Sequence, residues 1–195
     1  MPSTSASARG FRPAGERAFP APLTIGVVAD THVYTRGGYR FPPEVPDLFR
    51  RVGVGLILHA GDVNTSSVLE ELATVAPVLA VAGNNEEAAL CAALPEHVRF
   101  TVGPHAFVLL HGHGGKTART EARRYAGAVD CVVYGHSHIP KIEQAEGTIL
   151  FNPGSATDRR WQPHFGVGLI HVTLERIAPE LILYEDARHL RNVGG

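Results

Sequence analysis

The amino-acid sequence predicts a layered α/β domain. Short apolar runs recur along the chain, and several are rich in β-branched residues, as is typical of strands buried in a sheet. Helix-like stretches separate the early runs, whereas the later runs follow one another closely. Strands that alternate with helices favour parallel pairing, and successive strands favour antiparallel pairing. We therefore expect sheets that are parallel at the start of the chain and more antiparallel towards its end.

The individual elements follow from these runs. The first expected strand, residues 23–29, is a continuous apolar segment (LTIGVVA) that ends at the carboxylate of Asp30. Residues 65–75 predict a helix, because they begin with Thr and Ser, carry apolar residues at helical spacing and end before Pro77. Residues 117–125 predict a second, more polar helix. The other expected strands are residues 55–59, 78–82, 106–110, 129–134, 148–151, 166–172 and 180–184.

Composition indicates one folded unit. The chain has 195 residues, of which 44% are hydrophobic, which is enough for one domain with a substantial core. Residues 1–22 are rich in Ser, Ala, Pro, Gly and Arg, so we expect a disordered N-terminal tail followed by a single domain over residues 23–195. An organellar transit peptide is the alternative for this tail, but its prolines and glycines oppose an amphipathic helix.

Charge, cysteine usage and hydropathy argue against several classes of protein. The formal net charge of -1 gives no general reason to bind nucleic acid or anionic lipid. Cys91 and Cys131 have no paired spacing, which favours a reducing cytosol over a disulfide-bonded secreted fold. No apolar run approaches the roughly 20 residues that a membrane-spanning helix needs. We expect a cytoplasmic protein without stable nucleic-acid binding or a membrane span. A homo-oligomer is compatible with the sequence.

Side chains with metal-binding chemistry follow the expected strands at the points where they end. In open α/β sheets, ligands bind beyond the carboxyl ends of the strands, so these side chains are expected at one edge. Carboxylate, amide and imidazole groups in this mixture suit a pair of divalent cations. The segments are Asp30-Thr31-His32, Gly61-Asp62, Gly83-Asn84 and Gly135-His136-Ser137-His138, together with His111.

The spacing within two of these segments adds to the case. Asp30 and His32 are two residues apart, so in an extended segment both side chains point the same way, and the same applies to His136 and His138. Each motif alone is common by chance, and helix capping is the alternative for Asp30 and Asp62. Capping does not explain the histidines, and seven such residues at successive strand ends make coincidence a strained interpretation.

In this order, the motifs D-x-H, G-D, G-N-N-E, H-G-H and G-H-S-H resemble those of the calcineurin-like metallophosphoesterase superfamily. The likeness covers residues 23 to about 155 and is greatest to the small single-domain phosphodiesterases of the YfcE type, which carry a loop similar to residues 152–155 (NPGS). The resemblance implies a four-layer αββα sandwich with mixed sheets and a dinuclear metal site. It assigns Asp30, His32 and His138 to one metal, Asn84, His111 and His136 to the other, and Asp62 to a bridge between them.

This resemblance, with the physics of paired cations, predicts an enzyme that hydrolyses phosphodiesters of the aryl or nucleotide type. A metal-bridging hydroxide is expected to attack phosphorus in line. Asp62 and Asn84 then serve catalysis as ligands, and His113 contacts the phosphate. We also expect substrate contacts from Asn85 and from Arg159, for which a solvated surface position is the alternative.

One position departs from the family pattern and bears on the substrate. Asn85 stands where many relatives have a histidine or a cysteine, and in the relatives with histidine that side chain is proposed to assist the leaving group. Because an amide cannot act as a general acid near neutral pH, we expect a preference for aryl or activated diesters over alkyl monoesters.

Two further expectations concern the identity of the metal and the alternative function of the chain. The resemblance makes manganese the first expectation, while the ligand types also accept Fe, Zn, Ni or Co. The alternative function is a catalytically weak protein-interaction module of the same fold, similar to the retromer subunit. All seven ligand positions carry competent residue types, which favours the enzyme.

Overall fold

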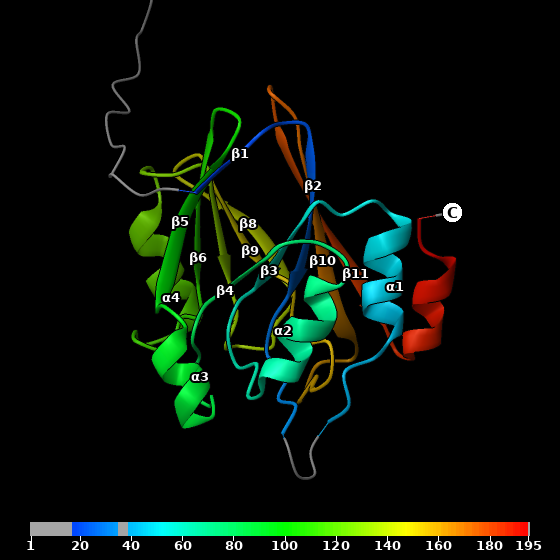
Figure 1. Ribbon diagram of the computed structural model, residues 1–195. Helices are drawn as coiled ribbons and strands as arrows, with labels where there is room; N and C mark the ends of the chain where they lie inside the picture. The colour runs from blue at the N-terminus through cyan, green and yellow to red at the C-terminus, as the bar shows by residue number, and fades with distance from the viewer. Residues whose placement is uncertain (1–16, 35–38, 195) are drawn as a thin grey trace, which may run out of the picture.

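The structure, a computed structural model, describes residues 17–34 and 39–194, and two β-sheets form its centre (Figure 1). The six-stranded sheet has the order β1 (Arg17–Phe19), β5 (His97–Val102), β6 (His105–Leu110), β7 (Cys131–Tyr134), β9 (Thr148–Asn152) and β8 (Lys141–Ala145). The five-stranded sheet has the order β11 (Ile177–Tyr184), β10 (Phe165–Val172), β2 (Leu23–Val28), β3 (Leu56–His59) and β4 (Val78–Ala80).

Both sheets are mixed, but only the five-stranded sheet follows the predicted change from parallel to antiparallel pairing along the chain; in the six-stranded sheet the late strands β7 and β9 are parallel. In the five-stranded sheet, β2, β3 and β4 are parallel, and β10 pairs antiparallel with both β2 and β11. In the six-stranded sheet, β6, β7 and β9 are parallel, whereas β5 and β8 pair antiparallel with β6 and β9. The parallel strands of each sheet bring several carboxyl ends to the same side of that sheet.

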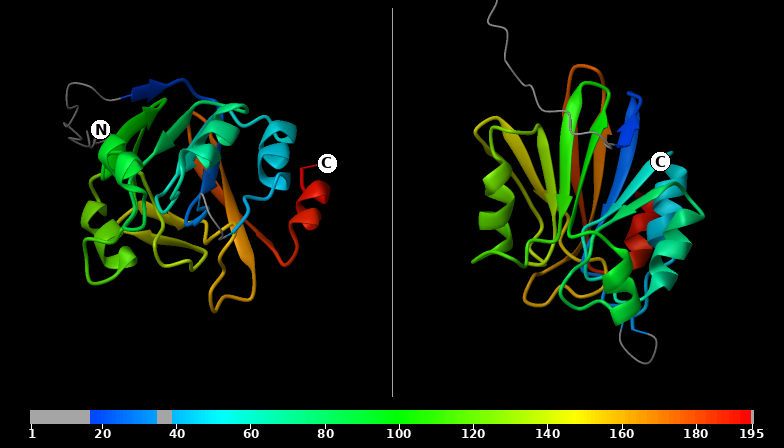
Figure 2. Two further views of the ribbon diagram at one scale, coloured as in Figure 1. Left: turned by 60° about the horizontal axis from the view of Figure 1, so that its bottom comes forward. Right: turned by 60° about the vertical axis from the view of Figure 1, so that its left-hand side comes forward.

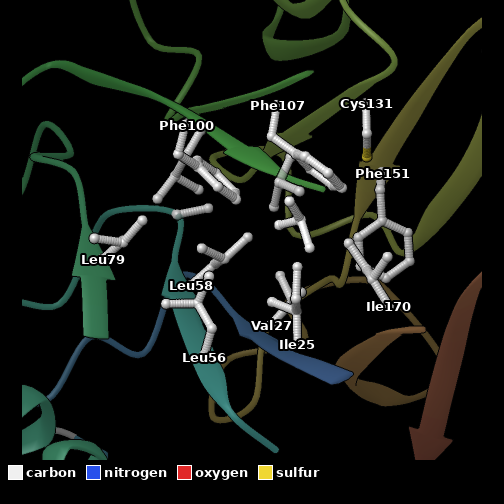
Figure 3. Packing of buried hydrophobic residues seen from close by; sticks show 14 of the residues in the cluster. Ile25, Val27, Leu56, Leu58, Leu79, Phe100, Phe107, Cys131, Phe151 and Ile170 are labelled. Atoms are coloured by element: carbon white, nitrogen blue, oxygen red, sulfur yellow. The ribbon is translucent and has the colours of Figure 1, made fainter. Parts of the chain in front are cut away.

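Three hydrophobic clusters hold four layers together. The first lies between the sheets, where Phe100 and Phe107 stack at 5.0 Å and residues from both sheets interdigitate (Figure 3). The second joins the five-stranded sheet to α1 (Glu44–Arg51), α2 (Ser66–Ala73) and η2 (Ala187–Asn192). The third joins the six-stranded sheet to α4 (Ala118–Ala122) and η1 (Arg123–Tyr125). Figure 2 shows helices on both outer sides of the paired sheets, so the expected αββα sandwich is confirmed.

The helices differ in part from expectation. The expected helix 65–75 is present as α2, and the expected helix 117–125 divides into α4 and η1. Neither α1 nor α3 (Ala88–Ala93) was predicted. The α1 helix contains Pro46 near its start, so this part of the sequence is typical of a loop. The helix nevertheless buries Leu48 and Phe49. A Cβ at Gly26 would lie 2.8 Å from the Phe49 ring, so the glycine in β2 makes room for this helix.

The predicted tail boundary at residue 22 is wrong for its last residues. Strand β1 pairs in parallel with β5, and the Phe19 ring lies 6.1 Å from that of Phe100 in an edge-on contact. Three residues are too few to show a strand period in the sequence, which is why this strand was missed. Residues 1–16 lie outside the described ranges. Within those ranges, no helix has both the length and the apolarity needed to cross a membrane.

Candidate metal centre

Six of the predicted ligand residues form two compact groups at the carboxyl ends of the strands. Within each group, one candidate ligand atom per residue lies within 4.8 Å of the others. The seventh residue, Asn84, belongs with the second group, because its Oδ1 atom lies 3.2 Å from Nε2 of His111. The first group is Asp30, His32 and His138, and the second is Asp62, His111 and His136.

The backbone brings these side chains together by a route that the sequence did not predict. Asp30, His32, His136 and His138 have φ angles of 53°, 46°, 64° and 56°. They lie in the left-handed region rather than in the extended segments that a two-residue period assumes. This conformation is unfavourable for non-glycine residues and is typical of functional sites, where surrounding contacts impose it. The expected convergence is found, but tight turns after β2 and β7 produce it.

Hydrogen bonds between loops hold these turns in place. The amide of Asp30 donates to the carbonyl of Gly61 at 2.9 Å, and the amide of His32 donates to the carbonyl of Asp62 at 3.0 Å. The NPGS loop supports the same turns, because the Ser155 hydroxyl donates to the carbonyl of Asp30 at 2.6 Å. The Asn152 amide donates to the carbonyl of Gly135 at 2.9 Å. The loop therefore buttresses both histidine-bearing segments.

In the first group, two imidazoles face each other across a short distance. The Nε2 atoms of His32 and His138 are 3.1 Å apart, and the rings stack at 5.0 Å. Nδ1 of His138 donates to the carbonyl of Asp158, which leaves its Nε2 lone pair directed at the group. Burial lowers the pKa of His138 to about 4, and burial also lowers the pKa of His32. Both rings are therefore neutral at neutral pH, the form that binds a metal.

Asp30 is the carboxylate of the first group and is fully buried. Its Oδ1 atom accepts from the His136 amide at 3.1 Å, but its Oδ2 atom has no hydrogen-bond partner. Burial raises the pKa of Asp30 to about 8. An unpartnered buried carboxylate oxygen carries a large desolvation cost, which a cation at this position would offset.

The second group is oriented in a similar way. Nδ1 of His111 donates to the carbonyl of Ala60 at 2.7 Å, so its Nε2 atom faces Asp62 at 3.3 Å. Burial alone would lower the pKa of His111, but the hydrogen bond that it donates to Asp62 and the charge of Asp30 raise it. His136 has a buried Nδ1 atom without a hydrogen-bond partner, and burial followed by the charge of His111 lowers its pKa.

Asp62 lies between the two groups. Its Oδ1 atom is 3.3 Å from Nε2 of His111, and its Oδ2 atom is 3.6 Å from Nε2 of His32. Burial alone would raise the pKa of Asp62, but the hydrogen bond and charge of His111 bring it below its ordinary value. A Cβ at Gly83 would collide with this carboxylate, so only glycine fits before Asn84. One charged carboxylate thus contacts a histidine of each group.

Glu86 positions the two loops that carry Asp62 and Asn84, a role that was not predicted from the sequence. Its Oε1 atom accepts from the amides of Val63 at 3.2 Å and Gly83 at 2.9 Å, and its Oε2 atom accepts from the amide of Asn64 at 2.6 Å. The acidic residue of the G-N-N-E motif was the only signal that could have indicated this role.

Of the three residues expected to contact the substrate, one is free to do so, and the other two bond to protein groups. His113 is exposed beside the second group, with its ring 5.4 Å from that of His111. The side chain of Asn85 instead donates to Oδ2 of Asp62 at 2.8 Å. The guanidinium of Arg159 instead donates to the carbonyls of Gln162 and Pro163 and lies over the Phe165 ring.

The expectation that Arg159 contacts the substrate is therefore not supported by the geometry. Its neighbour Arg160 acts electrostatically on the first group. Burial is the main cause of the lowered pKa values of His32 and His138, and the positive charge of Arg160 lowers them further. Arg160 itself is exposed, and its Nε atom lies 3.8 Å from the Asp158 carboxylate. The direction of the turn after the NPGS loop determines which of these adjacent arginines acts on the ligand groups. That direction cannot be predicted from the sequence.

Comparisons with known proteins agree with this geometry. The model of the calcineurin-like phosphoesterase superfamily domain matches residues 23–175. A probable metallophosphoesterase from Methanothermobacter thermautotrophicus is 35% identical over 163 residues, which cover 82% of this chain and 92% of the relative.

Solved structures with lower sequence identity share the fold. An archaeal phosphodiesterase superimposes with a TM-score of 0.66 at 20% identity, covering 82% of this chain and 100% of the other. Vps29 from Entamoeba histolytica, in a complex with zinc, superimposes with a TM-score of 0.65 at 23% identity, covering 83% of this chain and 99% of the other.

Proposed function

The chain belongs to the calcineurin-like phosphoesterase superfamily, and from this premise we propose that it hydrolyses phosphodiester bonds with two divalent metal ions bound side by side. The position of Asp62 carries this proposal, since its two carboxylate oxygens face histidines of different groups. A carboxylate in this position is suited to bridge two cations.

The donor set fits this proposal. Asp30, His32 and His138 would hold one ion, Asn84, His111 and His136 the other, and Asp62 both. The unpartnered atoms Oδ2 of Asp30 and Nδ1 of His136 support this fit, because both are buried and lack a protein partner. When bound, the two ions would supply an activated water and offset the charge of the phosphoryl group. Manganese remains our first choice on the resemblance alone, with Fe, Zn, Ni and Co as the other metals to be tested.

Other side chains of the site would bind and orient the substrate. His113, exposed beside the second group, would donate a hydrogen bond to a phosphate oxygen. Arg160 adds positive charge beside the first group and would favour an anionic substrate. The side chain of Asn85 donates to Asp62 and would fix the orientation of that carboxylate.

The preference for diesters follows from Asn85. Its amide has no proton to give to a leaving alkoxide near neutral pH, so leaving groups that depart as stable anions are favoured. A phosphomonoester dianion would also bring a second negative charge beside Asp30 and Asp62. We therefore propose aryl or otherwise activated diesters as the substrate class.

The test is a matched hydrolysis assay on protein reconstituted with each candidate metal. Bis-p-nitrophenyl phosphate should be hydrolysed only with metal present, and its kcat/KM should exceed that of an alkyl monoester such as glycerol phosphate by at least about 100-fold, since an alkyl monoester has a far poorer leaving group. Faster turnover of the alkyl monoester would refute the diester preference. Absence of metal-dependent hydrolysis of either substrate would refute the enzymatic proposal.

The second candidate function is a protein-interaction module with weak or no catalysis. The similarity of the fold to Vps29 fits this alternative. Against it stand the seven competent side chains, which the structure gathers into two groups. The hydrolysis assay separates the two candidates, because an interaction module would show little or no metal-dependent turnover.

A further inference from the structure

A buried histidine without a role in the proposed function lies beside the turn of the first group. His59 ends β3 and is fully buried, and so is Thr31, which stands between Asp30 and His32. Nε2 of His59 lies 3.1 Å from the hydroxyl of Thr31. That hydroxyl lies 3.4 Å from the carbonyl of Asp62, which also accepts from the amide of His32 at 3.0 Å. These contacts join the end of β3 to the two loops that present candidate ligands.

The position of one proton on His59 fixes the direction of these hydrogen bonds. Burial lowers the pKa of His59 to about 3, so its ring is neutral and carries one proton. Nδ1 is buried and has no hydrogen-bond partner among the described residues. A proton on Nδ1 would leave a buried donor unpaired, and Thr31 would then have to donate to Nε2 rather than to the carbonyl of Asp62. With the proton on Nε2, His59 donates to Thr31, and Thr31 donates to Asp62.

We propose that His59 is a positioning residue for the first metal ion and that it acts through the hydroxyl of Thr31. Asp30 and His32, on either side of Thr31, have left-handed φ angles of 53° and 46°, a conformation that surrounding contacts must impose. The hydrogen bond from His59 holds the residue between them and so fixes the directions in which both ligands point. This inference rests on the metal site of the proposed function, because it concerns how tightly that site holds its ion.

Calorimetry with Mn²⁺ alone tests this role without any substrate. His59→Leu removes the donor and should weaken the binding of one Mn²⁺ by at least about tenfold, the scale expected when a partner that orients metal ligands is lost. His59→Gln offers an amide N–H in place of Nε2 and should restore most of this affinity. Thr31→Val keeps the shape of the side chain without its hydroxyl and should cause a similar loss. In the double variant, the loss should be no greater than in Thr31→Val alone, because both changes remove the same hydrogen bond.

Two controls separate positioning from a general loss of stability. His171→Leu removes a similar contact in the same sheet, since the Thr24 hydroxyl lies 3.3 Å from Nδ1 of His171 near the start of β2. Ile170→Ala opens a cavity at a fully buried position of β10 and should lower Tm. Both variants should keep the Mn²⁺ affinities of the wild type.

Nitrogen NMR of the metal-free protein adds a readout that does not depend on metal. The ring of His59 should be protonated at Nε2 and not at Nδ1. A proton on Nδ1, an unchanged Mn²⁺ affinity in folded His59→Leu, or additive losses in the double variant would overturn the positioning role. If His59→Leu does not fold, the affinity of Thr31→Val decides the outcome.

The outcomes for His59 and for the proposed function are distinct. If the Mn²⁺ affinities respond as expected but no diester is hydrolysed, the proposed function fails and the role of His59 stands. If the wild type hydrolyses diesters but the variants bind Mn²⁺ as it does, the role of His59 fails and the proposed function stands. A wild-type protein that binds no Mn²⁺ would refute both.

Discussion

Replacing Asp62 with asparagine should lower kcat for bis-p-nitrophenyl phosphate by at least about 10³-fold, the scale seen when a central catalytic group is removed. The substitution preserves the shape of the side chain but removes the negative charge that faces both His32 and His111. A neutral amide bridges two cations poorly, so at least one ion should be lost or displaced. Steady-state kinetics at saturating metal measure this loss.

The control for Asp62→Asn is Asp47→Asn, which removes an exposed carboxylate of α1 that pairs with Arg50 on the same helix. This variant should keep wild-type kinetics. Circular dichroism must show that both variants are folded, because the amides of Asn84 and Asn85 donate to Asp62. A folded Asp62→Asn protein that retains more than about a tenth of the wild-type rate would contradict a central role for this carboxylate.

Metal loading should stabilise the protein, and more strongly at pH 8.5 than at pH 6.5. Burial raises the pKa of Asp30 from 3.8 to about 8. At pH values between these two, the carboxyl of Asp30 is protonated in the metal-free folded state but ionised in the unfolded state. The free energy of unfolding therefore falls as the pH rises through this range. The raised pKa of His111 acts in the same direction above 6.5. A bound cation takes the place of these protons and removes the loss.

Two other buried histidines set the acid side of this profile. Burial lowers the pKa of His59 to about 3 and that of His138 to about 4, so their contribution is present above 6.5 and is lost as the pH falls. The metal-free protein should thus be most stable near pH 6.5. Thermal unfolding with chelator and with Mn²⁺ measures the effect, and at pH 8.5 the metal should raise Tm by roughly 5 to 10 °C.

The Asp30→Asn variant serves as the control for this pH dependence. Without the titrating carboxyl, its metal-free stability should fall less between pH 6.5 and pH 8.5 than that of the wild type. A metal-free wild-type protein that becomes more stable over this range, or that gains no stability from metal at either pH, would contradict the assignment of Asp30.

The parts of the fold that were predicted are those with strong local patterns. The strands β2, β3 and β7 are buried over most or all of their length, so they appear as continuous apolar runs that end at a polar residue. Strand β5 was missed because it is only partly buried and its polar residues interrupt the run. The α1 helix was missed because its stability comes from packing of Leu48 and Phe49 rather than from its propensity.

The candidate site divides in a similar way. The residue types at strand ends were sufficient to predict which side chains converge, since sheet topology brings those ends together. The left-handed turns at Asp30 and His136 could not be predicted, because long-range contacts such as the hydrogen bond from Ser155 impose them. The same reason hid the role of Glu86, whose three amide partners lie on two separate loops.

The metal content of the reconstituted wild-type protein tests the central claim most directly. Elemental analysis after loading with manganese and removal of free ions should find two ions per chain, held by Asp30, His32 and His138 on one side, by Asn84, His111 and His136 on the other, and by Asp62 between them. A saturating content of one ion per chain, or only trace metal, would contradict the paired site.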